Sequence, residues 1–444
     1  MMKVLVVGSG GREHALVLSL SLSDKVDEVY CCPGNPGISQ IAFCSEIAVN
    51  DFEAIANFAK EKEIDLIVIG PDDPLAEGIV DYLEEQGLKV FGPKKDAAKL
   101  EWSKYFAKEF MLRRGIPTAQ YAAFDRREHA IAYAYSRKLP IVIKADGLAR
   151  GKGVAVVNTY DGAIGAINAC FDGKFGSAGQ LVIIEDFLEG EEASIFAICD
   201  GSGYALLPTA QDYKRLQDGD KGPNTGGMGA QSPNPLITAD LLKKVEDKVI
   251  KPALEGMREE GRPYKGFLYV GLMIKNGEPS VVEFNCRLGD PETQVVLPLL
   301  ECDLFDVLYA AAEGDLREFK GVLPSAELSK SGAAVCVVMA SGGYPDSPKV
   351  GLPIKFKIGF SLGEQSQVVD ETGDINHDEA KLILFHAGTK LDEERNLVTS
   401  GGRVLAVTAL AENLDKAREN VYKGINKIDF EGKHFRKDIA KSAL

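Results

Sequence analysis

Glu-Pro-Ser-Val-Val-Glu-Phe-Asn-Cys-Arg-Leu-Gly-Asp-Pro-Glu, residues 278–292, joins a predicted strand to a row of polar side chains. The paired valines predict the strand, and side-chain alternation then places Glu283, Asn285 and Arg287 on one face. Carboxylate and amide oxygens are ligands that Mg²⁺ takes beside water and phosphate, and a guanidinium fork suits a phosphate or a carboxylate. The stretch therefore predicts a metal and anion site. A solvated strand with a cross-strand ion pair is the alternative.

The end of the same stretch predicts a helix start. Asp290 would be the N-cap and Pro291 would occupy the first helical position, with Glu292 following. Such a helix end presents free backbone N–H groups to an anion. We therefore expect a second anion contact just beyond the strand.

Composition limits the classes of protein to consider. The 444 residues predict about three domains of ordinary globular composition. The net charge of −15, without a basic stripe, argues against nucleic acid and anionic lipid as partners, and we find no apolar run near the roughly 18 residues that span a bilayer. The eight cysteines show no Cys-x-x-Cys spacing, which predicts neither zinc nor disulfides and favours a cytoplasmic setting. The first residues read as a strand, so no signal peptide is expected.

The first hundred residues alternate predicted strands and helices, which indicates a parallel sheet with right-handed crossovers. Ligands of such sheets bind at the carboxyl ends of the strands, where Gly8–His14, Gly34–Gly37 and Gly70–Pro74 lie. The strands are expected at 3–7, 28–32, 65–69 and 89–91, and the helices at 13–22, 52–61 and 75–86.

A dinucleotide fingerprint is the obvious alternative for the first of these turns. Gly8-Ser9-Gly10 fits it, but Glu13 occupies the third glycine position, and Cys31–Pro33 follow where a ribose-binding acid is expected. An NAD-dependent dehydrogenase is therefore disfavoured. Backbone donors at Gly10 and Gly11 with the neighbouring Arg12 could still hold one phosphate, unless the glycines serve only a tight turn.

The middle of the chain predicts a flap and a nucleotide wall. Strands at 140–145 and 154–157 enclose the glycine-rich loop Gly147–Gly153, and Lys144, Arg150 and Lys152 supply positive charge for a polyphosphate. A strand at 181–188 ends among acids that could meet a ribose or an adenine. Residues 102–114 and 238–260 predict helices, 267–275 a strand, and 211–233 a long binding loop.

From about residue 327 the pattern changes to that of a separate α+β domain. Strands are expected at 333–340, 381–386 and 403–410, followed by a helix at 412–427. Its polar residues form no site that we can assign from the sequence.

Several long strings together resemble the glycinamide ribonucleotide synthetases, the phosphoribosylamine–glycine ligases of the ATP-grasp superfamily. The resemblance runs from Lys3 to Ile439. It implies a Rossmann-like domain at 1–101, an ATP-grasp domain at 102–326 with a lid at about 122–190, and an α+β domain at 327–444. The strings are Gly8–Ala15, Ile143–Ala149, Gly222–Gly229, Glu283–Glu292, Ser400–Leu405 and Arg436–Ile439.

The resemblance also implies ligands for particular residues. Mg²⁺ or Mn²⁺ would bind Glu283 and Asn285. Glu185 and Leu188 would meet adenine, and Glu192 the ribose. The ATP phosphates would contact Lys104, Lys144, Gly151, Lys152 and Gly153.

The implied reaction forms glycyl phosphate from glycine and ATP, and the amine of 5-phosphoribosylamine then displaces phosphate. Arg287, Lys144, Lys214 and Asp212 are the expected catalytic residues, and no protein nucleophile is required. The expected substrate contacts are Gly10, Gly11, Arg12, Glu13, Asn35, Gly37, Asp212, Arg287, Gly289, Asp290 and Glu292. We expect a monomer whose partners are these small molecules.

Three alternatives stay open from the sequence. These are an ATP-grasp ligase or carboxylase for another acid, the disfavoured dehydrogenase, and a non-catalytic nucleotide sensor. The chain departs from the family pattern at Asp72, where Glu is usual, at Leu288, where Phe is usual, and at Gln231, where an aromatic residue is common. Asp72 bears most on the acceptor pocket.

Overall fold

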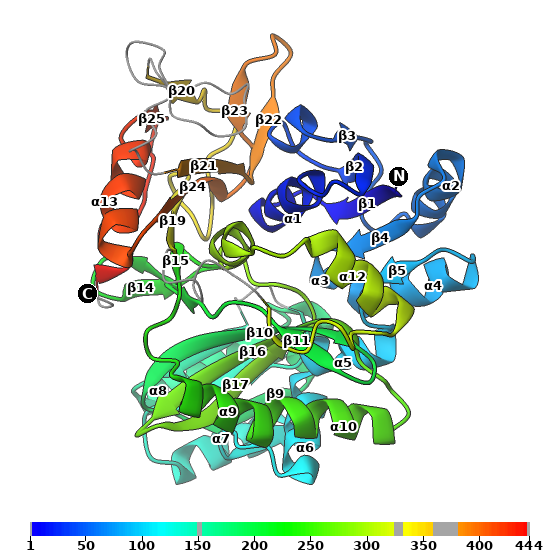
Figure 1. The fold of residues 1–444 in the computed structure, drawn as a ribbon. Helices are drawn as coiled ribbons and strands as arrows, with labels where there is room; N and C mark the ends of the chain where they lie inside the picture. Colours follow the sequence, from blue (N-terminus) through cyan, green and yellow to red (C-terminus); the bar gives the residue numbers. More distant parts are fainter. Residues whose placement is uncertain (1, 149–152, 324–331, 358–380, 442–444) are drawn as a thin grey trace.

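The computed structural model describes residues 2–148, 153–323, 332–357 and 381–441. Figure 1 shows the N-terminal part in blue and the C-terminal part in orange and red side by side, with the central sheets in green and cyan beneath them. No helix among the described residues is long and apolar enough to cross a membrane.

The N-terminal sheet is parallel, as the alternating pattern predicts, with strand order β3-β2-β1-β4-β5. The predicted helix at 75–86 is two helices, because Gly78 adopts φ +98° between them. The strands are β1 Met2–Gly8, β2 Val26–Pro33, β3 Phe43–Cys44, β4 Leu66–Ile69 and β5 Val90–Phe91. The helices are α1 Gly11–Ser21, α2 Phe52–Lys62, α3 Asp72–Glu77 and α4 Ile79–Glu85.

A small antiparallel sheet of order β6-β9-β7-β8 carries the predicted flap. The hairpin of β7 and β8 is confirmed by pairing between Ile141 and Val157 and between Lys144 and Val154. The strands are β6 Tyr121–Phe124, β7 Ile141–Ala145, β8 Val154–Val157 and β9 Val182–Asp186, and the helices are α5 Lys95–Trp102, α6 Lys104–Arg114, α7 Arg127–Ser136 and α8 Tyr160–Phe171.

The central sheet has the order β17-β16-β10-β11-β18 and is covered on both faces. Its strands are β10 Glu191–Asp200, β11 Tyr204–Leu206, β16 Lys265–Lys275, β17 Glu278–Asn285 and β18 Gly321–Val322. Helices α9 Ala239–Val245 and α10 Lys251–Glu259, joined by a π-helical turn at Glu246–Ile250, pack on one face. Helix α12 Leu304–Glu313 packs on the other.

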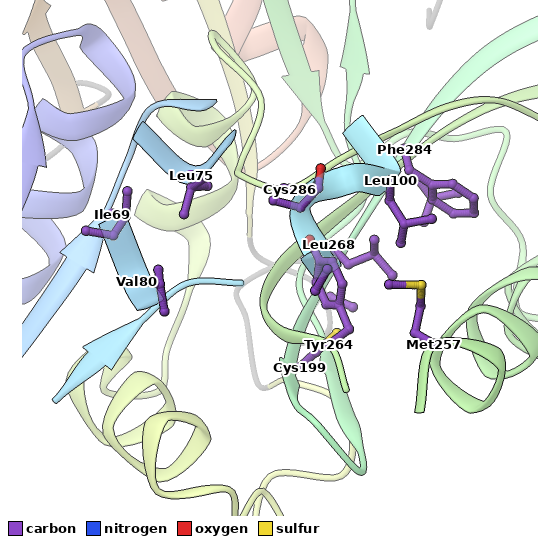
Figure 2. Close-up of a cluster of buried hydrophobic side chains, with 14 of the residues drawn as sticks. Ile69, Leu75, Val80, Leu100, Cys199, Met257, Tyr264, Leu268, Phe284 and Cys286 are labelled. Carbon is purple, nitrogen blue, oxygen red and sulfur yellow. Dashed lines mark hydrogen bonds between the residues drawn. The ribbon is translucent and has the colours of Figure 1, made fainter. Parts of the chain in front are cut away.

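One hydrophobic core joins the N-terminal sheet to the central sheet. Figure 2 shows Ile69, Leu75 and Val80 on one side of this cluster and Leu268 and Phe284 on the other. Leu100 of α5 belongs to the same cluster. Because apolar burial stabilises by about 25 cal/mol per Å², this shared core holds the two sheets in one arrangement.

The C-terminal sheet has the order β12-β15-β19-β24-β21, and two of its strands come from residues 211–233. The prediction of one long loop there was wrong, because β19 offers its edge to β15, and Gly229 lets the backbones approach: a Cβ would lie 2.6 Å from the Cys336 carbonyl. The elements are β12 Gln211–Asp212, β13 Arg215–Gln217, β14 Lys221–Asn224, β15 Gly229–Ser232, β19 Ala333–Ala340, β20 Lys355–Phe356, β21 Lys381–His386, β22 Thr389–Leu391, β23 Leu397–Thr399, β24 Arg403–Ala411, β25 Ile428–Asp429 and α13 Leu414–Ile425.

The helix predicted to begin at Asp290 begins at Thr293 instead, as α11 Thr293–Val296. Asp290 does not cap it, because its carboxylate accepts from Gln294 Nε2 at 2.7 Å and from Arg403 Nη2 at 2.8 Å. A four-residue helix presents few aligned N–H groups, so the predicted helix start was wrong, and the second anion contact expected there stays a prediction.

Candidate active site

A cavity of about 510 Å³ lies where the small sheet, the central sheet and the N- and C-terminal parts meet. This volume is in the range of small-molecule and cofactor sites. Glu283, Asn285 and Arg287 all line it, so the row of polar side chains predicted along β17 does face one space.

One end of the cavity is built around the buried carboxylate of Glu185 on β9. Lys144 Nζ on the neighbouring β7 lies 2.9 Å from Oε1, and Lys108 Nζ on α6 lies 3.1 Å from Oε2. Lys144 also donates to the Val282 carbonyl at 3.2 Å, which links the small sheet to β17. Burial lowers the pKa of Lys108 to about 8, against the opposing charge of Glu185. We call this the nucleotide end.

Lys108 was not predicted as a site residue, although it lies one helical turn after Lys104 and therefore on the same face of α6. Lys104 donates to the Gly147 carbonyl at 3.0 Å, and burial lowers its pKa. Leu188, Glu192 and Gly153 line the cavity as predicted, whereas the predicted Gly151 and Lys152 lie outside the described residues.

The middle of the cavity carries the predicted metal ligands Glu283 and Asn285. Burial alone would raise the pKa of Glu283, but Lys214, Lys144 and other cations outweigh it and hold the pKa below its ordinary value. The Lys214 Nζ lies 4.0 Å from Glu283 and 3.3 Å from Glu192. Within the described ranges no group of three or more His, Cys, Asp or Glu side chains is arranged to hold a metal. Two protein oxygens suit a metal that shares its remaining positions with phosphate and water.

Arg287 is held by a residue that the sequence did not single out. Its Nη2 lies 3.0 Å from Oε1 of the buried Glu101, at the end of α5, and Glu101 Oε2 accepts from the Cys286 N–H at 2.6 Å. Arg12 and Arg287 both donate to the Leu288 carbonyl. Asp72 lines the cavity nearby; burial would raise its pKa, but Arg287 and Arg12 lower it.

The remaining predicted phosphate contacts are engaged within the protein. The Gly10 N–H donates to Glu13 at 2.6 Å, and a Cβ on Gly11 would lie 2.5 Å from Gln294 Nε2. Asn35 donates to the Ser9 and His386 carbonyls and accepts from the Gly37 N–H at 2.9 Å. Of the residues predicted in these two loops, Arg12 is the one that lines this cavity.

Two carboxyl groups, the partly buried Asp212 and the buried Glu292, meet at the far end of the cavity, which we call the acyl end. Burial, and next the charge of Glu292, raises the pKa of Asp212, and burial raises the pKa of Glu292. Asp212 Oδ1 has no hydrogen-bond partner among the described residues. A buried, unpartnered carboxylate oxygen is a strong acceptor for a ligand N–H donor.

Arg403, on β24, also lines the acyl end and ion-pairs with Asp290 at 2.8 Å. Arg403 lies in the string Ser400–Leu405, which carries part of the family resemblance, but its sequence surroundings indicate no role for it. Only the pairing of β24 with β19, and of β19 with β15, brings it to the cavity.

Comparison with known proteins gives a consistent result over nearly the whole chain. Residues 2–101, 102–293 and 334–442 match the models for the N domain, the ATP-grasp (A) domain and the C domain of phosphoribosylglycinamide synthetase. The chain is 48% identical over 450 residues to the phosphoribosylamine–glycine ligase of Chlorobaculum tepidum, covering 100% of each. It is 45% identical to the human trifunctional purine biosynthetic protein adenosine-3, covering 100% of this chain and 42% of that one.

Comparison with solved structures leads to the same family. The crystal structure of the Thermotoga maritima phosphoribosylamine–glycine ligase superposes with a TM-score of 0.82 at 35% identity, covering 98% of this chain and 100% of that one. A biotin carboxylase from Campylobacter jejuni has a TM-score of 0.70 at 17% identity over 97% and 92% of the two chains, which shows a shared fold.

Proposed function

The chain belongs to the phosphoribosylglycinamide synthetase family, and from that premise we propose how its cavity works. Its activity is that of an ATP-dependent phosphoribosylamine–glycine ligase of purine biosynthesis. The observation that carries the residue roles is the convergence of Lys144, Glu283 and Arg287 on one cavity.

ATP lies at the nucleotide end in this proposal. Adenine would contact Glu185 and Leu188, since the carboxylate can accept from an exocyclic amine and the leucine supplies an apolar wall. The ribose hydroxyls would meet Glu192. Lys104 and Lys144, on two different elements, would face the phosphates, with the described Gly153 beside them.

Glu283 and Asn285 would hold Mg²⁺ or Mn²⁺. The donor set fits, because the lowered pKa keeps Glu283 ionised and both side chains face the space between the lysines and Arg287. A divalent ion there supplies charge neutralisation for the phosphoryl oxygens. The biotin carboxylase domain of the Hydrogenobacter thermophilus 2-oxoglutarate carboxylase, which shares the fold, was solved with the magnesium salt of ADP, and the assignment of a metal to these two residues is our proposal.

Glycine would bind between the middle of the cavity and the acyl end. Arg287 and Lys214 are cations that suit its carboxylate. The carboxyl oxygens of Asp212 and Glu292 suit its ammonium group, because Asp212 Oδ1 has no hydrogen-bond partner among the described residues and Glu292 is buried beside it. The role of Asp212 therefore changes from holding the reacting carboxylate to holding the amine. This arrangement selects an amino acid over bicarbonate, which carries no ammonium group.

The chemistry then needs no protein nucleophile. A carboxylate oxygen of glycine attacks the γ-phosphorus of ATP, ADP leaves, and glycyl phosphate forms. The amine of 5-phosphoribosylamine attacks the carbonyl carbon, and phosphate leaves with the C–O bond electrons. Lys144, Lys214 and Arg287 stabilise the charge that develops, and a single such contact is typically worth about 3 kcal/mol.

The acceptor would enter beside Arg12 and Asp72, next to Gly289 and Asp290. Arg12 is the phosphate partner of choice there, because it lines the cavity and a guanidinium binds phosphate oxygens in pairs. Asp72 could accept from a ribose hydroxyl. A monomeric state and a cytoplasmic setting stay predictions; each of the eight cysteines lies in the described ranges and is free, which supports the second.

ADP release tests the proposal directly. We expect release that depends on glycine and is coupled to 5-phosphoribosylamine, with bicarbonate or D-alanine giving little. Glu283→Ala should lower kcat about 100- to 1,000-fold. Glu278→Ala is the matched control, since Glu278 lies on the same strand but is exposed and bonded to Lys244 and Lys248. Full activity of Glu283→Ala with Mg²⁺ would exclude the metal assignment.

A further inference from the structure

Gly226, in the turn between β14 and β15, is held by two side chains from the C-terminal part. Its N–H donates to Tyr344 Oη at 3.0 Å, and its carbonyl accepts from Arg403 Nη1 at 2.6 Å. Both backbone polar groups of one glycine are therefore bonded by residues more than a hundred positions away. A turn rich in glycine has little rigidity of its own, so such bonds determine where it lies.

Arg403 joins this turn to Asp290, in the stretch that follows β17. Besides Gly226, its Nη1 donates to the Asp290 carbonyl, and its Nη2 pairs with the Asp290 carboxylate at 2.8 Å. The Tyr344 ring packs directly on Gly402, the residue before Arg403. A Cβ on Gly402 would lie 2.3 Å from the ring, so the glycine leaves the room that the ring needs. The Arg403 guanidinium and the Tyr344 phenol therefore lie close together in space where they bind Gly226.

The turn in turn contacts the groups that we assign to glycine. Gly227 has φ +115°, and a Cβ there would lie 2.8 Å from Asp212 Oδ1 and 2.4 Å from Pro291. Thr225 donates to the Lys214 carbonyl through its N–H at 2.7 Å and its hydroxyl at 2.8 Å. A displaced turn would therefore displace both Asp212 and Lys214.

We propose that Arg403 and Tyr344 are a positioning pair, through which the C-terminal part holds the Thr225–Gly227 turn over the reacting carboxylate of glycine. The inference rests on the proposed placement of glycine at Asp212 and Lys214. Within the described part of the chain, the side-chain hydrogen bonds of Arg403 go to Gly226, Gly227 and Asp290, all at the acyl end. The pair acts on acyl transfer and leaves ATP binding unchanged.

The test compares Arg403→Gln and Tyr344→Phe with two matched variants of the same C-terminal part. Arg418→Gln removes donors to the Ile439 and Lys437 carbonyls, and Tyr422→Phe removes a hydroxyl bonded to Arg436 and Ile439. These bonds hold the chain end against α13. Each matched variant therefore loses the same kind of contact without touching the turn.

We expect Arg403→Gln to lower kcat about 10- to 100-fold and Tyr344→Phe about 3- to 10-fold, the range expected for hydrogen bonds to a charged and to a neutral donor or acceptor. The KM for ATP should stay within about twofold of wild type in both. Hydrogen exchange of a peptide spanning residues 221–228 should accelerate in both variants and stay at the wild-type rate in Arg418→Gln and Tyr422→Phe.

Three results would overturn the positioning role. They are a kcat within twofold of wild type for Arg403→Gln, an ATP KM that rises in step with the fall in kcat, or equal losses in the matched variants. Glu283→Ala separates this failure from failure of the proposed function. If Glu283→Ala is inactive while Arg403→Gln has normal activity, the site assignment is supported and the positioning role of Arg403 and Tyr344 is rejected.

Discussion

The two ends of the cavity are built from the chain in different ways. At the nucleotide end, Lys104, Lys108, Lys144 and Glu185 come from α6 and the adjoining small sheet, within one continuous part of the sequence. At the acyl end, the lining residues come from four separated segments: Asp72, Asp212, Arg287 and Arg403.

This difference predicts which kinetic constant a substitution at each end should change. The nucleotide end rests mainly on the pairing of β7 with β9 and the packing of α6, with one bond from Lys144 to Val282 of β17, so a substitution there should alter ATP affinity alone. The acyl end exists only when the N-terminal, central and C-terminal sheets are packed together, and two of its ion pairs, Arg287–Glu101 and Arg403–Asp290, join distant segments of the chain. Substitutions there should lower kcat and leave the KM for ATP unchanged.

Asp212→Asn should give the largest effect of those that test this contrast. The amide keeps the shape of Asp212 but removes the carboxyl group that we assign to the ammonium group of glycine. We expect kcat/KM for glycine to fall about 100- to 1,000-fold, measured by ADP release, with an unchanged KM for ATP. Asp218→Asn is the control, since its carboxylate accepts from the Lys437 N–H outside the cavity. If the KM for ATP rose by a similar factor, the two ends of the cavity would not be functionally separate.

Glu101→Gln should have the next largest effect. Glutamine can still accept from the Cys286 N–H, but it no longer balances the charge of Arg287. Because removal of a buried partner loosens the other, we expect kcat to fall about 10- to 100-fold in steady-state assays. Glu109→Gln on α6, which loses the charged partner of Tyr121, should stay near wild type. Equal activity of the two variants would show that Glu101 does not position Arg287.

Lys108→Met should affect the nucleotide end and little else. It removes one of the two cations on Glu185 and leaves Lys144 in place. We expect the KM for ATP to rise about tenfold while kcat stays within about twofold, as measured with glycine and 5-phosphoribosylamine saturating. In a double-mutant cycle with Glu185→Gln, the second substitution should add less than the first. Additive losses would show that Lys108 and Glu185 do not act as a pair.

The sequence predicted those parts of the fold and site that depend on local pattern. The alternation along β17 placed Glu283, Asn285 and Arg287 on one cavity, and the parallel sheet followed from the order of strands and helices. At one departure from the family pattern, Leu288, the contact that the structure shows is made by the backbone. The carbonyl of Leu288 accepts from Arg12 and Arg287, whatever its side chain.

The residues missed by the sequence are those whose partners lie far away along the chain. Nothing near Glu101 or Arg403 indicates that one will balance Arg287 and the other Asp290. Residues 211–233 look like a loop because β15 finds its partner in β19, which follows about a hundred residues later, and β12 in turn pairs with β15. The missed helix start at Asp290 has the same cause, since Arg403 takes the carboxylate that would have capped the helix.

The last effect we predict acts on the catalytic site indirectly, through the junction that holds the acyl end together. His14 on α1 accepts from the His386 N–H at 2.9 Å, and Asn35 donates to the His386 carbonyl, so this contact joins the N-terminal and C-terminal sheets. Burial, and for His14 the neighbouring His386, lowers the pKa of His14 to about 3; burial lowers that of His386 to about 4. Both rings are therefore neutral in the folded protein at neutral pH.

The sign of the pH dependence follows from that neutrality. As pH falls below the ordinary histidine pKa of about 6.5, the unfolded chain takes up protons that the folded chain refuses, so stability is lost towards pH 4, by up to about 1.4 kcal/mol per pH unit for each ring. Urea unfolding should show a shallower loss in His14→Gln than in wild type, and the exposed His129→Gln should match wild type. Glycine-dependent turnover should fall over this range before an ATP analogue dissociates. Loss of both at the same pH would mean that the junction supports the two ends equally.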